Sequence, residues 1–141
     1  MKVLLDTNIL IDYISEREPF TEDARSIIRM CMEKDLYGCI SAHTVTNTFY
    51  ILRKELSVSQ RKHFLLDMCR FLAVAGLDKE LLVSALENES FTDIEDCLQA
   101  ECAREFGADY IVTRNVKDFA ESSIPAITPG EFIQLAEGTQ Q

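Results

Sequence analysis

The sequence has few of the residues that interrupt regular structure, with five glycines and three prolines in 141 residues. Hydrophobic residues make up 47% of the chain and charged residues 27%, a composition that excludes a disordered or fibrous protein. A domain of about 150 residues buries roughly 70% of the surface of its unfolded chain, which is enough for a hydrophobic core. We therefore expect one globular domain.

Apolar runs long enough to cross a membrane are missing. The first apolar segment, Val3 to Leu5, ends after a few residues at Asp6. It is therefore neither a signal sequence with a basic flank nor a membrane-spanning helix. We expect no membrane partner and a cytoplasmic location.

Cysteines spaced as Cys-x-x-Cys are also missing, and the number of cysteines is odd. All lie in apolar surroundings, so we expect reduced core residues and no disulfide framework: Cys31, Cys39, Cys69, Cys97 and Cys102. The only histidines are His43 and His63, and the sulfur and imidazole ligands that a structural zinc site prefers are not clustered. We assign no catalytic role to either histidine.

Basic residues are scarce. Fourteen lysines and arginines against 24 acidic residues leave a net charge of −10, which argues against a broad basic surface for nucleic acid. Divalent cations held by carboxylates would invert the local field. The charge therefore weakens a nucleic-acid function without excluding one.

Short apolar runs alternate with helix-like stretches, which predicts an α/β fold with a parallel sheet. Residues 1–136 form one domain in this prediction, and residues 137–141 form a flexible tail. We expect strands at 2–5, 38–40, 71–74, 110–112 and 125–128. We expect helices at 8–16, 21–35, 43–55, 59–70, 78–87, 93–106 and 129–136.

Residues at the expected helix ends support these boundaries. Thr21 is a candidate N-cap, and Thr92-x-x-Glu95 has the spacing of a capping box. Gly107 suits the end of the helix at 93–106, and Pro129 suits the start of the last helix.

Acidic residues follow two of the expected strands and begin one helix. Asp6 directly follows the first strand, Asp93 and Asp96 begin the helix at 93–106, and Asp118 follows the fourth strand. Ligands of open α/β sheets bind outside the carboxyl ends of the strands. If the first and fourth strands are neighbours, Asp6 and Asp118 converge there and Asp96 joins them.

Carboxylates within about 4 Å of each other repel by a few kcal/mol at an effective dielectric near 20, so they must neutralise, separate or bind a cation. An oxygen-only cluster selects a hard ion such as Mg²⁺ or Mn²⁺. Hydrolysis of a phosphodiester is the natural use of such a site.

Each acidic segment also has a purely structural explanation. Asp6 could cap the following helix, Asp93 and Asp96 could be acids favoured by the helix dipole, and Asp118 could belong to a turn. The agreement of all three segments favours the metal site.

Several polar residues could support the site. Asn47 either faces the pocket or faces solvent, and Thr113 and Asn115 either hold a water or carboxylate or serve a turn. Asn8 is a further supporting candidate. Basic side chains could meet phosphates, although ordinary solvated charges explain them better: Arg53, Lys54, Arg114 and Lys117.

Three segments together resemble the PIN-domain ribonucleases, the fold of the VapC-like toxin in type II toxin–antitoxin pairs. Val3 to Asp12 resembles the first acidic motif of that family, Glu95 to Ala100 its helix-borne acid, and Ile111 to Phe119 its last motif. The resemblance covers nearly the whole chain.

The resemblance implies a three-layer α/β/α sandwich whose five-stranded parallel sheet has the order 3-2-1-4-5. It also implies a Mg²⁺- or Mn²⁺-dependent site that cleaves RNA, a protein antitoxin and a homodimer. Carried over residue by residue, Asp6, Asp96 and Asp118 are the catalytic residues and metal ligands, with Asp93 as an auxiliary acid.

Two positions depart from the family pattern. Many members have a glutamate on the helix after the second strand, where this chain has Asn47, and many have an aspartate where it has Asn115. A neutral amide does not replace a charge. A weakened scaffold that binds RNA or a protein without cleavage is therefore the alternative to a metal-dependent endoribonuclease. An aspartyl phosphotransferase with Asp6 as nucleophile ranks below both, because position 8 is Asn.

Overall fold

The computed structural model describes residues 1–139 and contains a five-stranded sheet in the order β3-β2-β1-β4-β5. All neighbouring strands are parallel, so the predicted order is confirmed. The strands are β1 (Lys2–Leu5), β2 (Tyr37–Ser41), β3 (Ala73–Ala75), β4 (Tyr110–Val112) and β5 (Ala126–Ile127).

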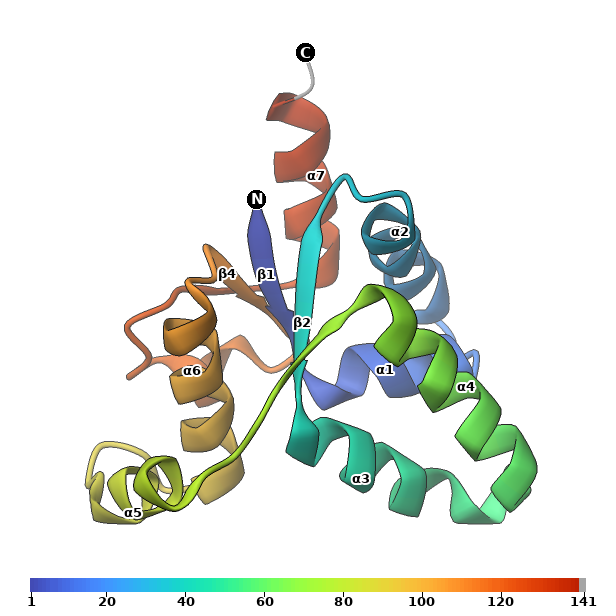
Figure 1. Ribbon diagram of the computed structural model, residues 1–141. Helices are drawn as coiled ribbons and strands as arrows, with labels where there is room; N and C mark the ends of the chain where they lie inside the picture. The colour runs from blue at the N-terminus through green and yellow to red at the C-terminus, as the bar shows by residue number, and fades with distance from the viewer. Residues whose placement is uncertain (140–141) are drawn as a thin grey trace.

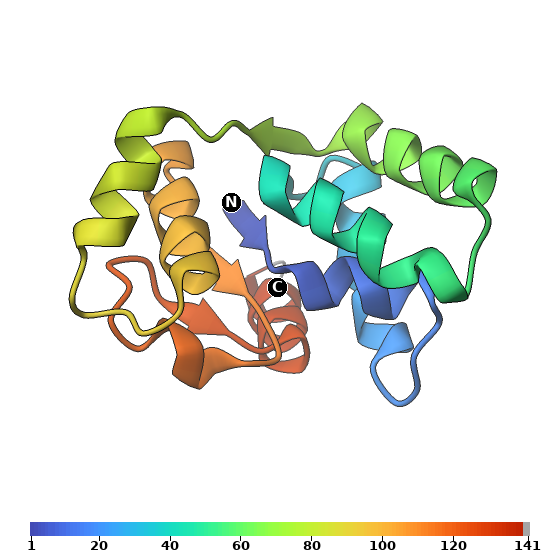
Figure 2. The same ribbon diagram turned by 90° about the horizontal axis from the view of Figure 1, so that it is seen from below.

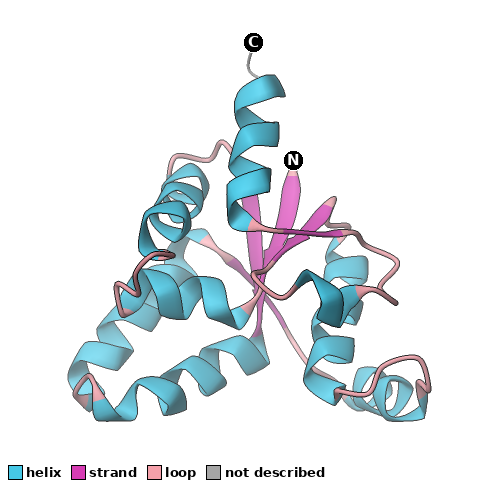
Figure 3. Cartoon of the chain, turned by 180° about the vertical axis from the view of Figure 1, so that it is seen from behind, coloured by secondary structure: helices cyan, strands magenta, loops and turns pink. Residues whose placement is uncertain are grey.

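The helices cover both faces of the sheet, as the predicted three-layer sandwich requires (Figures 1 and 3). They are α1 (Thr7–Ile14), α2 (Thr21–Met32), α3 (Ala42–Ile51), α4 (Val58–Phe71), α5 (Lys79–Glu87), α6 (Ile94–Phe106) and α7 (Pro129–Thr139). Two short 3-10 helices are η1 (Leu52–Lys54) and η2 (Val116–Phe119).

The central strand β1 divides the core in two. Val3 and Leu5 face the cluster that contains side chains of α1, α2, α4 and α7, whereas Leu4 faces the cluster formed with α5 and α6. Because successive strand residues point to opposite faces, a strand covered on both sides is apolar throughout. All three leucine and valine side chains are fully buried.

Several predicted boundaries and caps were wrong. The last helix continues past Ala136 to Thr139, because its Phe132 and Ala136 are buried and hold it against the core. The predicted tail thus begins within this helix, and residues 140–141 lie outside the described residues. The third strand starts at Ala73, because α4 extends to Phe71.

Some of the predicted helix caps are confirmed and others are wrong. Gly107 ends α6 in the left-handed conformation, with φ 75°, as predicted. Thr21 does not cap α2: it is the first helical residue, and its buried Oγ1 has no hydrogen-bond partner within residues 1–139. Asp93, and not Thr92, caps α6.

All five cysteines are free. The prediction of a core location holds for all but Cys69, which is exposed on α4. Among the helices of residues 1–139, none combines the length and hydropathy that a membrane span requires.

Candidate active site

Asp6 lies where β1 ends and α1 begins. Its backbone N–H donates to the Val112 carbonyl at 3.0 Å, which continues the pairing of β1 with β4. Its side chain caps α1, with Oδ1 accepting from the Thr7 backbone N–H at 2.8 Å. The predicted cap role is therefore real. It also fixes the carboxylate at the edge of the sheet where ligands bind.

Three further side chains hold the Asp6 carboxylate. Thr113 donates to Oδ2 at 2.7 Å, Asn8 donates to the same oxygen at 3.3 Å, and Gln99 donates to Oδ1 at 3.2 Å. Burial nevertheless raises the pKa of Asp6, the hydrogen bonds from Thr113, Thr7 and Gln99 oppose that increase, and the charge of Asp118 adds to it. Asp6 is thus held by several hydrogen bonds, but it forms no ion pair with a lysine, arginine or histidine among residues 1–139.

A cleft of about 240 Å³ opens beside Asp6. Figure 2 looks onto this edge of the sheet, with the starts of α3 and α6 on either side of the β1–α1 junction. The cleft is lined by Asp6, Thr7, Asn8, Ile11, His43, Asn47, Ile51, Glu95, Asp96, Gln99 and Asn115. The structure therefore brings Asp6, Asp96 and the amides of Asn8, Asn47 and Asn115 together around one cleft, and of the two orientations left open for Asn47 it shows the one that faces the cleft.

Asp96 separates this cleft from a second hollow. The second hollow, of about 250 Å³, contains Asp93, Asp96 and Asp118 but not Asp6. Burial raises the pKa of Asp96 to about 7, with contributions from the charges of Asp93, Asp118, Asp6 and Glu95 in decreasing order. The four predicted acids thus form a row centred on Asp96, and they do not converge on a single point.

The acids next to Asp96 have different local roles. Oδ1 of Asp93 accepts from the backbone N–H groups of Glu95 at 2.8 Å and Asp96 at 3.3 Å, so one of its oxygens is used to cap α6. Glu95 extends toward α3, where its Oε1 lies 3.2 Å from Nε2 of His43. His43, to which the sequence assigned no role, is therefore part of the wall of the cleft.

Gln99 is a site residue that the sequence reasoning missed. Its side chain is 3% exposed, and its Nε2 donates both to Asp6 and to Oγ1 of Thr44 at 3.0 Å. Its Oε1 has no partner among the described residues. Position 99 follows Asp96 by one helical turn, so a glutamine among buried apolar neighbours was the signal that could have identified it.

Arg114 does not face the cleft as a free cation. Its Nε and Nη2 donate to the two carboxylate oxygens of the buried Asp12 at 2.6 and 3.2 Å, and its guanidinium lies 4.1 Å from the ring centroid of Phe20. Both roles considered for Arg114 from the sequence, a contact with phosphate and an ordinary solvated charge, are therefore wrong. The pair instead joins the segment after β4 to α1.

The donor atoms of the cleft suit a hard divalent cation. They include carboxylate, amide and hydroxyl oxygens, and two of the carboxyl groups, Asp6 and Asp96, have pKa values raised by burial and by the neighbouring negative charges. Within residues 1–139, no three His, Cys, Asp or Glu side chains are grouped closely enough to enclose an ion. Mg²⁺ is usually held by only one or two carboxylates and keeps several waters, so the site fits such an open mode of binding.

Solved structures with the same fold include toxin–antitoxin proteins. A DNA-bound VapBC structure from Salmonella typhimurium is 22% identical over 92% of this chain and 98% of the matched chain, with a TM-score of 0.66. A toxin–antitoxin complex from Klebsiella pneumoniae is 24% identical over 90% and 97%, with a TM-score of 0.65. VapC20 from Mycobacterium tuberculosis, described as a toxin that cleaves the sarcin-ricin loop, is 13% identical over 77% and 86%, with a TM-score of 0.61.

These likenesses establish a shared fold. No curated protein matches the chain. A family model described as PIN domain matches residues 2–117. Because this match covers most of the 141 residues, the chain belongs to the PIN-domain family.

Proposed function

We propose that the chain is a metal-dependent endoribonuclease and the toxin of a type II toxin–antitoxin pair. The observation that carries this proposal is the row of carboxylates at the carboxyl edge of the sheet, where Asp6 and Asp96 line one cleft and Asp93 and Asp118 lie on the other side of Asp96. Membership in the PIN-domain family supports a nuclease, and the toxin–antitoxin structures of the same fold support the toxin role.

Asp6 and Asp96 would hold Mg²⁺ or Mn²⁺, with Asp118 as a further ligand and Asp93 as an auxiliary acid. A bound divalent ion supplies a lower pKa for the attacking water and stabilises the charge that builds on the phosphate. Thr113, Asn8 and Gln99 keep the Asp6 carboxylate in one orientation. Asn47 and Asn115 line the cleft as neutral amides and can donate to phosphate oxygens.

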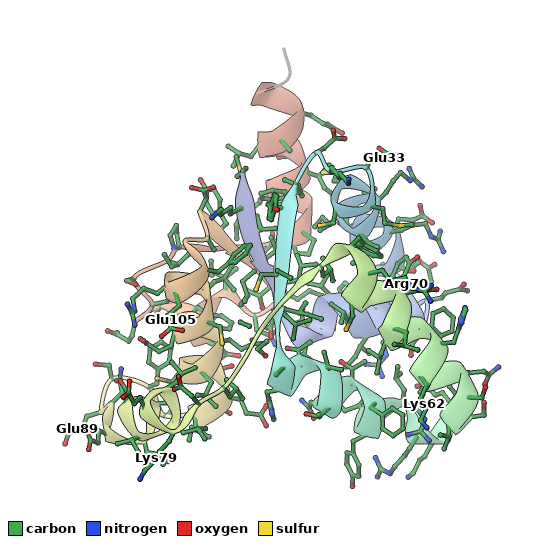
Figure 4. All side chains as sticks on the ribbon, in the orientation of Figure 1. Glu33, Lys62, Arg70, Lys79, Glu89 and Glu105 are labelled. Atoms are coloured by element: carbon green, nitrogen blue, oxygen red, sulfur yellow. The ribbon has the colours of Figure 1, made fainter. Side chains whose placement is uncertain are left out.

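The test is cleavage of RNA by the purified chain, free of any partner, with Mg²⁺ or Mn²⁺. We expect Asp6→Asn and Asp96→Asn to lower the rate by about 100-fold or more, since several kcal/mol of charge stabilisation depend on the ion. Glu105→Gln is the matched control, because Glu105 is an exposed acid of α6 that points away from the cleft (Figure 4). No cleavage by the wild-type chain, with no effect of Asp6→Asn, would overturn the proposal.

The alternative is a scaffold that binds RNA or a protein without cleavage. Asn47 and Asn115 favour it, because both line the cleft where a further carboxylate would strengthen metal binding. Calorimetric titration with Mn²⁺ separates the two functions: the nuclease requires a site in the micromolar to millimolar range, and the scaffold does not.

A protein antitoxin, a homodimer and a cytoplasmic location belong to the same proposal. The toxin–antitoxin complexes that share the fold support the antitoxin. Copurification of the chain with the product of a neighbouring small gene, followed by loss of RNA cleavage in that complex, would test the partner. The mass of the isolated chain in solution would test the dimer.

A further inference from the structure

The second hollow, on the far side of Asp96 from Asp6, combines side chains that the proposed reaction does not use. It lies between the loop that joins α5 to α6 and the 3-10 helix η2, two segments that run side by side in Figure 2. Phe91 and Thr92 come from the loop, and Lys117 comes from η2. Asp96 belongs to both hollows, so a ligand that crosses it reaches this one.

Phe91 contributes an aromatic surface to the hollow. Its ring is half-buried and packs against the core cluster of α5 and α6, while the same residue lines the hollow. A ring that is fixed on one side by the core and open on the other loses little entropy when a flat group stacks on it. Nucleobases stack on aromatic side chains in single-stranded RNA complexes, whereas bases inside a duplex are not accessible.

Lys117 contributes the positive charge. It is exposed, and in the described part of the chain it forms no ion pair, although Asp93, Asp118 and Glu121 line the same hollow. Lysine is a flexible cation that binds phosphate as a point charge. In a chain with a net charge of −10, an unpaired lysine beside the carboxylate row offers a local contact for a phosphate that the acids would otherwise repel.

We propose that this hollow binds the nucleotide next to the scissile phosphate of single-stranded RNA, with its base on Phe91 and its phosphate at Lys117. The inference rests on the proposed nuclease function, which it deepens by naming Phe91 and Lys117 as the residues that hold the nucleotide beside the cleaved bond. The nucleotides on the two sides of the cleaved bond would then occupy the two hollows, with Asp96 between them.

The test compares binding of a labelled, unstructured oligoribonucleotide of about 10 nucleotides with that of a blunt-ended duplex of the same strand, whose bases are all paired. Fluorescence anisotropy is measured with Mg²⁺ on Asp6→Asn protein, because Asp6 does not line the second hollow. Phe91→Leu keeps an apolar contact with the core but removes the aromatic face, and Phe91→Tyr restores that face. Lys62→Gln on α4 is the charge-matched control for Lys117→Gln, since Lys62 lies in a different part of the surface (Figure 4).

We expect Phe91→Leu to weaken binding of the unstructured strand by about 5- to 100-fold, and Phe91→Tyr to bind normally. We expect Lys117→Gln to lower the slope of log affinity against log salt by about 1, and Lys62→Gln to leave it unchanged. In the cleaving wild-type background, Phe91→Leu should raise KM far more than it lowers kcat. Equal binding of the blunt-ended duplex, whose bases cannot stack on Phe91, would overturn the inference.

The inference and the proposed function fail in different ways. If the wild-type chain cleaves RNA but Phe91→Leu and Lys117→Gln behave like Lys62→Gln, the inference is wrong and the nuclease function stands. If Asp6→Asn protein fails to fold, as judged by circular dichroism, the KM values of the cleaving wild-type chain and of its Phe91→Leu and Lys117→Gln variants with Mg²⁺ replace the binding measurement. A wild-type chain that neither binds nor cleaves RNA overturns both.

Discussion

Thr113 links Asp6 to the segment that follows β4. Its hydroxyl is fully buried, donates to Asp6 Oδ2 at 2.7 Å and accepts from the Asn115 backbone N–H at 2.9 Å. Thr113→Val keeps the shape of the side chain but removes both hydrogen bonds, so Asp6 Oδ2 keeps only the longer bond from Asn8, at 3.3 Å. We expect a loss of about 1–3 kcal/mol in the free energy of unfolding, measured by urea denaturation, and a reduction of about 10- to 100-fold in Mn²⁺ affinity.

Thr113→Ser is the control for this prediction, because serine retains the hydroxyl and loses only a methyl group. It should restore most of the Mn²⁺ affinity of the wild-type chain. Equal Mn²⁺ affinity of the valine variant and the wild type would show that Thr113 serves packing alone.

Asp96 should lower the stability of the metal-free protein as the pH rises. Its pKa is about 7 in the folded chain, against an ordinary value of 3.8. As the pH rises, the unfolded chain therefore loses this proton at a lower pH than the folded chain does. Folding stability therefore declines between about pH 4 and pH 7 and stays reduced above that range. We expect Asp96→Asn to melt about 2–4 °C higher than the wild type at about pH 8 in EDTA, and to differ little at about pH 4.

The experiment is a pair of thermal melts followed by circular dichroism, with Glu105→Gln as the control for removal of one exposed acid from the same helix. A lower melting temperature of Asp96→Asn at about pH 8 would contradict the prediction. If the higher melting temperature is accompanied by loss of RNA cleavage, the row of acids trades stability for function.

At the scale of elements, one buried ion pair ties the two halves of the site together. Asp12 of α1 is fully buried, and Arg114, after β4, bonds both of its carboxylate oxygens. Arg114→Met keeps an apolar stem over Phe20 but leaves the buried carboxylate of Asp12 without a partner. We expect a loss of about 3–5 kcal/mol in urea denaturation.

The double variant Asp12→Leu with Arg114→Met removes both charges and should recover much of that loss, because a buried pair is often replaced by apolar residues at little cost. A single Arg114→Met variant as stable as the wild type would show that water solvates Asp12 in its absence.

The order of elements could be predicted because each buried strand is a short apolar run between helices. Val3 to Leu5 and Tyr110 to Val112 were predicted at their observed positions or within one residue of them. The ends of helices were harder, because they depend on tertiary contacts. Asp93 caps α6 in place of Thr92, and α7 continues while its buried Ala136 packs on the core.

The acids of the candidate site were most readily predicted where a residue adjoins the end of a strand or the start of a helix. Asp6 and Asp96 satisfy this condition, and the structure places both in one cleft. Gln99 and His43 lie within helices and reach the cleft through the packing of α6 and α3. Their spacing alone does not show which neighbour they meet, so pattern reasoning left them out.

At the scale of the whole molecule, the net charge of −10 opposes the binding of a polyanion such as RNA. In the second hollow, Lys117 forms no ion pair with the neighbouring acids among the described residues. These acids are Asp93, Asp96 and Asp118. Divalent cations should therefore govern RNA binding more strongly than monovalent salt does, because only the former neutralise the row of carboxylates locally.

An ion that binds the folded chain but not the unfolded one raises the free energy of unfolding by about 2.7 kcal/mol at 100 times its Kd. We expect Mn²⁺ to raise the melting temperature of the wild-type chain in proportion to the logarithm of its concentration once the site is saturated. Asp6→Asn and Asp96→Asn should abolish this rise, whereas Glu105→Gln should retain it. An equal rise in all four proteins would mean that Mn²⁺ acts by general screening of the negative charge and that the carboxylates beside the cleft do not form the site.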